Sequence, residues 1–352
     1  MESTGPIKGR GTSLNTKNRY LRQHIAYDHP EGLDEPMESD KPETELFFDS
    51  AANIVNKVTS PDVGMMYSAN PYQGCEHGCV YCYARNTHEY WGWNAGLDFE
   101  RKIIVKKDAP LLLEKFLLQK SWIPQPIVLS GNTDCYQPVE QKLKLTRKML
   151  EVFAKYRHPV GIITKNTTVL RDLDILKDLA ADNLVHVYFS ITTLNEDLRR
   201  VMEPRTATSN RKFEAISELT KAGVPVGIMN APLIPGINHH EIPAIIRAAA
   251  NAGARSAGYT VVRLNGPIGD IFKKWLADHY PDRIHKVINQ ISDMHGGKVN
   301  DSEWGVRIKG QGNFADIISR MFRLSKEKYM AGMSMPPYNT GIFRKGGNFR
   351  LF

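Results

Sequence analysis

The sequence has no run of about 18 apolar residues, the length that a membrane-spanning helix requires. Its first residues, Met1 to Pro6, also lack the apolar stretch of a signal peptide. These two absences predict a cytoplasmic protein with no membrane span. The 352 residues are enough to bury the core of one large α/β domain or of two small ones.

Cysteine is scarce as well, with only four residues, and three of these lie within eight positions. This distribution is not that of a disulfide framework. It favours a reducing compartment, in which thiolates stay free to bind metal. The formal net charge is +8 and the pI is about 9.1, which favours polyanionic partners only mildly.

The three clustered cysteines are Cys75, Cys79 and Cys82, in the spacing C-x3-C-x2-C. A short loop with this spacing can turn three thiolates toward one metal centre. Gly74 and Gly78 permit the positive φ that a wrapping loop needs. Three ligands are one fewer than a cubane iron–sulfur cluster or a tetrahedral metal accepts. The open position invites a substrate or a cofactor.

Two other ligand sets stay open at this point. A zinc ion could take His77 as its fourth ligand, although the sequence has no second Cys/His cluster to complete a typical zinc knuckle. Cys135 could instead close a four-cysteine cluster and make the protein an electron carrier. In functional terms, the alternative to an enzyme is a non-catalytic metal-cluster protein that binds nucleic acid through its basic surfaces.

The cysteine loop, with Tyr81 directly before the last cysteine, resembles the signature of the radical S-adenosylmethionine (radical SAM) superfamily. Flanking segments resemble more narrowly the group related to spore photoproduct lyase, the DNA repair photolyase-like proteins. The resemblance covers roughly residues 45 to 325. The segments that carry it are 70–75, 81–85, 131–138 and 203–205.

This resemblance implies a [4Fe–4S] cluster on Cys75, Cys79 and Cys82, with S-adenosylmethionine chelated by the fourth iron. One electron, from a donor of the flavodoxin or ferredoxin type, would then cleave the sulfonium. The resulting 5′-deoxyadenosyl radical would abstract a hydrogen atom from the substrate. The likeness to the lyase group suggests a nucleic-acid lesion or base as substrate, and a protein side chain or small metabolite is the alternative.

Short apolar runs alternate with amphipathic segments from about residue 60 onward. Continuous apolar runs are typical of strands buried on both faces of a parallel sheet, with catalytic groups at the carboxyl ends of the strands. We therefore predict an α/β fold, and the resemblance implies a radical SAM partial (β/α)6 barrel. The predicted strands are 64–69, 127–130, 160–164, 185–191, 226–230 and 258–264.

The chain divides into a polar N-terminal arm (1–45), a radical SAM core (46–265) and a C-terminal helical extension packed on the core (266–352). Helices are predicted at 268–280, 283–295 and 314–325, covering one edge of the sheet. The arm is either mobile or an extended strap, and a basic arm that touches nucleic acid is a further alternative. Its charged residues are Arg10, Lys17, Arg19, Arg22 and His24, followed by Glu35, Glu38, Asp40 and Glu43.

The resemblance also suggests which residues surround S-adenosylmethionine. Many relatives carry Gly-Gly-Glu after the second strand to hold the ammonium group, and this chain has Gly131, Asn132, Thr133 and Asp134 there. Lys165 and Arg205 would pair with the carboxylate, and Ser190 with the carboxylate or a ribose hydroxyl. Tyr81 and Gly236 would lie against the adenine. An ordinary polar turn or a structural polar group is the alternative in most of these cases.

Cys135 follows the second strand, close to where the radical would form, and a thiol there is a candidate hydrogen-atom donor and catalytic residue. A small buried apolar residue is the alternative reading. The aromatic group Tyr83, Tyr90, Trp91 and Trp93 either stacks bases or packs over the cluster, and packing is the commoner use of such residues.

Overall fold

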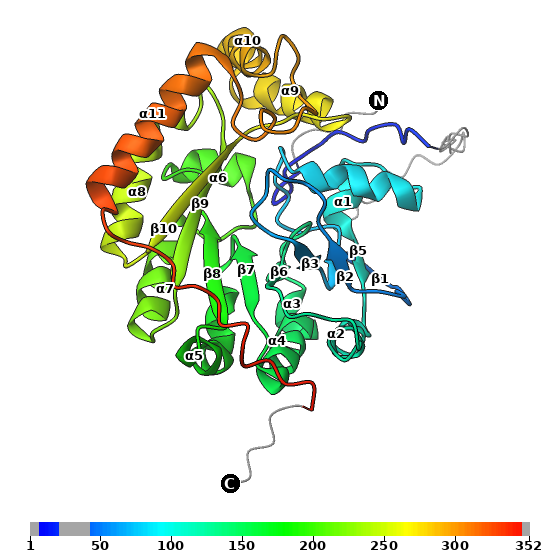
Figure 1. The fold of residues 1–352 in the computed structure, drawn as a ribbon. Helices are drawn as coiled ribbons and strands as arrows, with labels where there is room; N and C mark the ends of the chain where they lie inside the picture. Colours follow the sequence, from blue (N-terminus) through cyan, green and yellow to red (C-terminus); the bar gives the residue numbers. More distant parts are fainter. Residues whose placement is uncertain (1–6, 21–42, 347–352) are drawn as a thin grey trace, which may run out of the picture.

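Six parallel strands form the centre of the computed structural model, which describes residues 7–20 and 43–346 (Figure 1). They lie in the order β10-β9-β8-β7-β6-β3, and β2 (Val55–Lys57) pairs antiparallel with β3. The predicted α/β fold and partial barrel are confirmed. The strands are β3 (Tyr67–Ala69), β6 (Ile127–Leu129), β7 (Val160–Thr164), β8 (Val185–Ser190), β9 (Val226–Leu233) and β10 (Ser256–Val261).

The strands form where apolar, mostly β-branched residues run continuously. In the register of the sheet, Ile162 pairs with Val187, and Val187 pairs with Val226. All three side chains are fully buried in one core cluster with Leu150 and Leu219 of the covering helices. Each such burial contributes about 1.5–3 kcal/mol. This row of contacts fixes the register, and therefore the level at which each strand ends.

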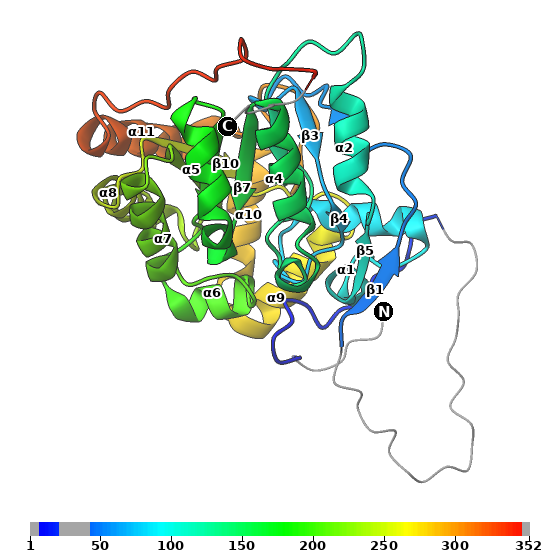
Figure 2. The ribbon, with the colours of Figure 1, turned by 90° about the horizontal axis from the view of Figure 1, so that it is seen from below.

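Helices cover the outer face of the sheet (Figures 1 and 2). Gly223 and Gly253 follow α7 and α8 with φ of 85° and 101°, as expected for residues that end a helix. The covering helices are α2 (Ala109–Leu117), α4 (Leu145–Tyr156), α5 (Leu173–Ala181), α7 (Ser209–Lys221) and α8 (Ile242–Asn251). The shorter helical segments are α3 (Glu140–Leu143), α6 (Glu196–Met202), η1 (Tyr83–Trp91), η2 (Thr167–Asp172), η3 (His239–Glu241) and η4 (Pro281–Arg283).

Several details differ from the sequence-based expectation. Leu143 does not share a helix with Leu150, because Lys144 adopts a positive φ of 52° and separates α3 from α4. The last barrel strand ends at Val261 rather than at residue 264. A second sheet, in the order β1-β5-β4, was not predicted. It consists of β1 (Glu45–Phe48), β5 (Lys102–Val105) and β4 (Tyr72–Gln73), and α1 (Leu97–Arg101) precedes β5.

Residues 7–20 lie as an extended strap across the cysteine loop and η1. The Gly11 amide donates to Glu100 Oε2 at 2.9 Å, and the Asn18 side chain donates to the Glu89 carbonyl at 2.8 Å. Only glycine fits at position 11, because a Cβ there would lie 1.6 Å from the Gly78 carbonyl oxygen. Other charged positions of the predicted arm lie outside the described residues: Arg22, His24, Glu35, Glu38 and Asp40.

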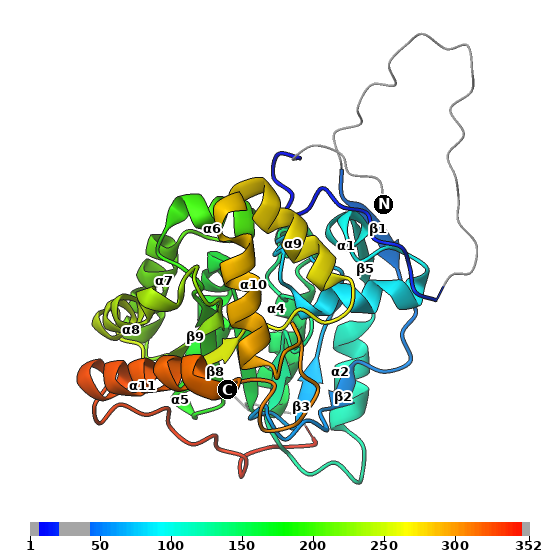
Figure 3. The ribbon, with the colours of Figure 1, turned by 90° about the horizontal axis from the view of Figure 1, so that it is seen from above.

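The C-terminal helices are α9 (Ile268–His279), α10 (Ile284–Met294) and α11 (Gly312–Tyr329). Helix α11 packs against α8 at the β10 side of the sheet. Helices α9 and α10 instead lie across the carboxyl ends of the strands, where Phe272 shares an apolar cluster with Tyr81 (Figure 3). The expectation that all three cover one edge was therefore wrong for these two. No helix in the described part of the chain has the length and apolarity to cross a membrane.

Candidate cluster and cofactor site

The cysteine loop follows β4 in the chain and lies at the carboxyl end of the barrel sheet. Gly74 and Gly78 have φ of 77° and 67°, which confirms that the loop needs glycine at both turns. The Cys75 amide donates to the Phe99 carbonyl at 2.9 Å, and the Cys82 amide donates to the Cys79 carbonyl at 3.3 Å. These bonds curl the segment so that its three thiols come from one compact loop.

All four cysteines are free thiols. Burial raises the pKa of Cys75, Cys79 and Cys82, and the Lys165 ammonium opposes this effect at each of the last two. Buried thiolates need further positive charge, which a bound iron centre would supply. The donor set therefore fits an iron–sulfur cluster.

The zinc alternative with His77 finds no support in the geometry. Among residues 7–20 and 43–346, no three His, Cys, Asp or Glu side chains converge on a position for one ion. A cubane cluster does not require such convergence, because each thiolate binds a different iron. His77 is fully buried, and burial lowers its pKa to about 4, so the imidazole is neutral. Its Nδ1 lies 3.4 Å from Asp134 Oδ2.

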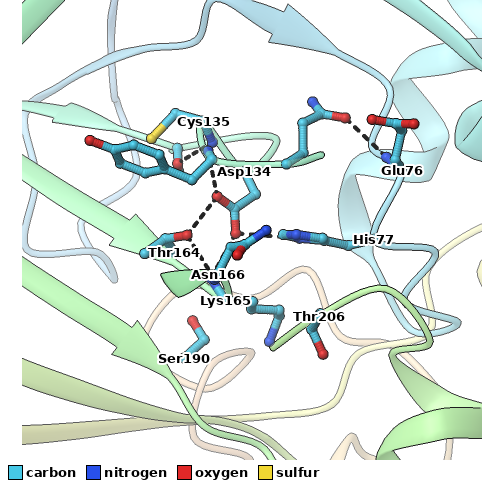
Figure 4. A network of polar contacts seen from close by, with 12 residues as sticks. Glu76, His77, Asp134, Cys135, Thr164, Lys165, Asn166, Ser190 and Thr206 are labelled. Atoms are coloured by element: carbon cyan, nitrogen blue, oxygen red, sulfur yellow. Dashed lines mark hydrogen bonds and ion pairs between the residues drawn. The ribbon is translucent and has the colours of Figure 1, made fainter. Parts of the chain in front are cut away.

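Asp134 organises the ends of two strands (Figure 4). Its Oδ1 accepts from the Thr164 hydroxyl at 2.8 Å, and its Oδ2 accepts from the Lys165 amide at 2.7 Å. The Tyr136 amide donates to Oδ1 as well, at 2.8 Å. Protein donors thus occupy most of the carboxylate that the sequence suggested for the cofactor ammonium. As predicted, Asp134 lies beside the cysteine loop. Its contacts link the ends of β6 and β7 to His77 of that loop.

Lys165, at the end of β7, lies beside the cysteine loop. Its ammonium is 3.0 Å from Glu203 Oε1 and 5.6 Å from the centre of the Tyr81 ring. Thr192 donates to the same Glu203 oxygen at 2.6 Å, and the Tyr81 hydroxyl bonds to it too. Burial raises the pKa of Glu203 to about 7, although the Lys212 ammonium acts in the opposite direction. Glu203 lies in a segment that carries the family resemblance, but the sequence did not predict a role for it at this site.

Arg205 lies on the other side of the cysteine loop. Its Nη1 is 3.3 Å from Glu76 Oε1, and its Nε donates to the Gly9 carbonyl at 3.0 Å. The Arg205 amide also bonds to the His77 carbonyl at 3.4 Å. The guanidinium therefore ties the strap to the cysteine loop, and its charge is already matched by a carboxylate.

The remaining predicted cofactor residues lie at the carboxyl ends of β6 and β8 and near α10. The Asn132 amide donates to the Asn70 side chain at 2.9 Å, and the Thr133 hydroxyl donates to the Tyr72 carbonyl at 2.7 Å. Ser190 lies next to Lys165 in Figure 4. Gly131 accepts a bond from the Tyr83 hydroxyl at 2.6 Å. Gly236 has φ of 73° and faces Gln290 of α10.

Cys135 is fully buried in the main core cluster, with neighbours such as Tyr136 and Met149. Burial raises the pKa of its thiol strongly. Its amide is fixed by the Ser130 hydroxyl at 2.8 Å, and its carbonyl accepts from Thr146 at 2.6 Å. Its thiol also lies close to the Asp134 carboxylate and to the Ser130 and Thr146 hydroxyls, so both readings of Cys135 stay open.

A buried ion pair supports the loop from behind. Arg85 and Glu100 are both completely buried, with Nη2 and Oε1 2.5 Å apart. Arg85 Nε donates to the Cys79 carbonyl at 2.9 Å, and its Nη1 donates to the Gly96 carbonyl at 3.0 Å. Sequence reasoning missed both residues. The signal that was available is the place of Arg85, three residues after Cys82, in the motif that carries the family resemblance.

An α/β partial barrel that carries a three-cysteine loop at the carboxyl ends of its strands is the arrangement expected of a radical SAM protein. The family model of the radical SAM superfamily matches residues 69–249. An uncharacterized protein of Mycobacterium tuberculosis is 30% identical over 244 residues, which are 69% of this chain and 71% of that protein. One of Methanocaldococcus jannaschii is 27% identical over 230 residues, 64% of this chain and 81% of that protein.

This chain belongs to the radical SAM superfamily, whose members use a [4Fe–4S] cluster and S-adenosylmethionine. Among solved structures, spore photoproduct lyase complexed with dinucleoside spore photoproduct has a similar fold. The TM-score is 0.61, the identity is 16%, and the match covers 83% of this chain and 82% of the lyase. A match of this identity supports the fold alone.

Proposed function

We propose that Cys75, Cys79 and Cys82 bind the [4Fe–4S] cluster and that the protein cleaves S-adenosylmethionine reductively. The observation that carries this proposal is one loop with three free thiols, beside the Lys165 ammonium at the carboxyl end of a parallel barrel. When bound, the reduced cluster and S-adenosylmethionine supply a 5′-deoxyadenosyl radical that abstracts a hydrogen atom.

The chain's own residues orient and shield that chemistry. The Lys165 side chain is largely buried and held by Glu203, which fixes its ammonium where a cofactor carboxylate can be bound. Tyr81 is held in turn by Glu203, which presents its ring as a flat apolar surface for an adenine. The strap and α9 pack over the loop and exclude water from it.

The ammonium group of the cofactor needs acceptors other than a free carboxylate. Asp134 is largely occupied by protein donors, whereas the Asn132 side chain makes no hydrogen bond to the described residues. We therefore assign the ammonium contact to Asn132 and the Thr133 oxygen, with Asp134 as the residue that positions them. Ser190 and Arg205 stay proposals, Arg205 acting through Glu76 and the strap.

The proposed substrate is nucleic acid. The net charge of +8 and the fold shared with spore photoproduct lyase support it. The hydrogen-donor role predicted for Cys135 remains a prediction, and it requires that a radical reach the core cluster where this thiol lies. The electron donor, of the flavodoxin or ferredoxin type, also remains a proposal.

Deuterium transfer tests the substrate proposal. The anaerobically reduced protein would be given deuterated S-adenosylmethionine together with irradiated or intact oligonucleotides. Mass spectrometry would then follow deuterium in the 5′-deoxyadenosine and in the DNA. We expect deuterium to move between the 5′-deoxyadenosyl group and the oligonucleotide. Formation of 5′-deoxyadenosine with no exchange into any nucleic acid would refute nucleic acid as the substrate while leaving cofactor cleavage intact.

A further inference from the structure

Five aromatic side chains lie near the cysteine loop in two groups, one a stacked pair and the other a set of three rings. Tyr20 stacks on Tyr90, with centroids 5.0 Å apart and an interplanar angle of 23°. Trp91 stacks on Trp93 at 6.3 Å and 22°, and Phe47 lies 4.7 Å from Trp93. These residues come from the strap, from the end of η1 and from β1. We call them the aromatic strip.

The rings of the strip face solvent to an unusual degree. Tyr90 is 74% exposed, Tyr20 is 54% exposed and Trp91 is 43% exposed. Of the two alternatives for Tyr90 and Trp91, this exposure favours base stacking over packing on the cluster. A contiguous apolar patch on a protein surface generally marks an interaction site.

Hydrogen bonds hold the strip in place before any partner binds. The Trp91 indole donates to Gln73 Oε1 at 2.8 Å, and the Asn18 side chain donates to the Trp93 carbonyl at 2.9 Å. Rings fixed in this way lose little conformational entropy when a ligand stacks on them.

Helix η1 links the strip to the candidate radical site. It starts directly after Cys82, and its first residue, Tyr83, bonds to Gly131 at the carboxyl end of β6. A 3₁₀ helix rises about 2.0 Å per residue, so Tyr83 and Tyr90 lie about 14 Å apart along it. That is about the length of four stacked nucleotides at 3.4 Å each. A nucleic-acid strand whose bases stack on the aromatic strip could therefore extend to the cysteine loop.

Cations accompany the rings. The Arg19 guanidinium lies 5.7 Å from the centre of the Tyr20 ring, and the Lys102 ammonium lies 5.5 Å from that of Trp93. The Arg19 side chain is half exposed, whereas its partner Glu89 is fully buried, so the positive charge is the one that solvent meets. Stacking rings interleaved with cations are the usual surface for single-stranded nucleic acid.

We propose that the aromatic strip binds unpaired bases of a single-stranded nucleic acid and leads that strand toward the cysteine loop. The inference rests on the proposed nucleic-acid substrate, to which it adds a surface and a strand state. Duplex DNA is not the expected ligand, because its bases already stack on one another and cannot lie on protein rings. A protein partner on the exposed β1 strand is the competing occupant.

Fluorescence anisotropy with a labelled 12-residue oligothymidine at low salt tests the proposal. Each lost base–ring stack should weaken binding between about 5-fold and 150-fold, so Tyr90→Ala and Trp91→Ala should each fall in this range. Trp304 is 60% exposed on another loop, and Trp304→Ala is the matched control, with less than a two-fold effect expected. A duplex of the same length should bind more weakly than the single strand.

Three results would overturn the proposal: equal affinity of wild type and Trp91→Ala, equal losses in Trp304→Ala, or preference for the duplex. A change of oligomeric state in Tyr90→Ala without a change in oligonucleotide affinity would assign the strip to a protein interface instead. Iron content and 5′-deoxyadenosine formation are measured on the same samples. If these persist while oligonucleotide binding is absent, the strip assignment fails and the radical SAM function stands.

Discussion

The buried Arg85–Glu100 pair gives the sharpest stability prediction. Replacing Glu100 by Gln keeps the shape of the side chain and removes its charge, leaving the Arg85 guanidinium buried without an anion. Both side chains are completely buried and 2.5 Å apart, so solvent cannot compensate. Breaking a buried pair in this way costs about 3–5 kcal/mol of unfolding free energy.

The effect should reach the cysteine loop as well. Glu100 also accepts from the Gly11 amide, and Arg85 donates to the Cys79 carbonyl. We therefore expect Glu100→Gln to release iron faster than wild type when a chelator is added anaerobically. That readout separates loop positioning from general stability.

Urea unfolding followed by circular dichroism measures the first effect. The matched control is Glu327→Gln, because Glu327 and Arg323 form an exposed i,i+4 pair at 2.9 Å on α11. Such pairs contribute only about 0.3–0.5 kcal/mol. If Glu100→Gln costs no more than Glu327→Gln, the pair does not support the loop and the reasoning is refuted.

Three further predictions concern the strap, the core and the cofactor pocket. Gly11→Ala should cost about 1–3 kcal/mol by overpacking against Gly78, whereas Gly64→Ala, where a Cβ meets nothing within 4 Å, should be nearly neutral in the same urea assay. Burial lowers the pKa of His158 to about 3 from 6.5. The unfolding free energy that depends on neutral His158 is fully present above pH 6.5 and is lost as pH falls toward 3. His158 alone should account for a loss of about 1.5–2 kcal/mol of unfolding free energy between pH 6.5 and 5, so His158→Gln should lose less than wild type by about that amount. Lys165→Met should weaken S-adenosylmethionine binding by about 1.5–3 kcal/mol in equilibrium dialysis, and unchanged affinity would remove Lys165 from the pocket.

The barrel could be predicted because most of its six strands are apolar runs that need burial on both faces. The small sheet could not. All four residues of β1 are exposed, β4 has two residues, and β1 pairs with β5 across more than 50 positions of sequence. Nothing local in those segments distinguishes them from loops.

The candidate site was predictable where a residue's place depends on a strand end. Lys165 and Asp134 follow β7 and β6, and the structure brings both to the cysteine loop. Glu203 and Arg205 are charged residues on either side of Pro204 in one turn, and sequence alone does not indicate which of them faces Lys165. Tertiary packing decides it: Glu203 turns inward to Lys165, and Arg205 turns outward to Glu76.

Iron and sulfide analysis of anaerobically purified protein tests the central claim most directly. We predict a brown protein with four irons and four sulfides per chain, retained in Cys135→Ala and lost in Cys75→Ala, Cys79→Ala and Cys82→Ala, because two thiolates cannot hold the cluster with one iron open. On reduction, the wild type should convert S-adenosylmethionine to 5′-deoxyadenosine and methionine. A colourless protein with one zinc, or loss of iron in Cys135→Ala, would contradict the account.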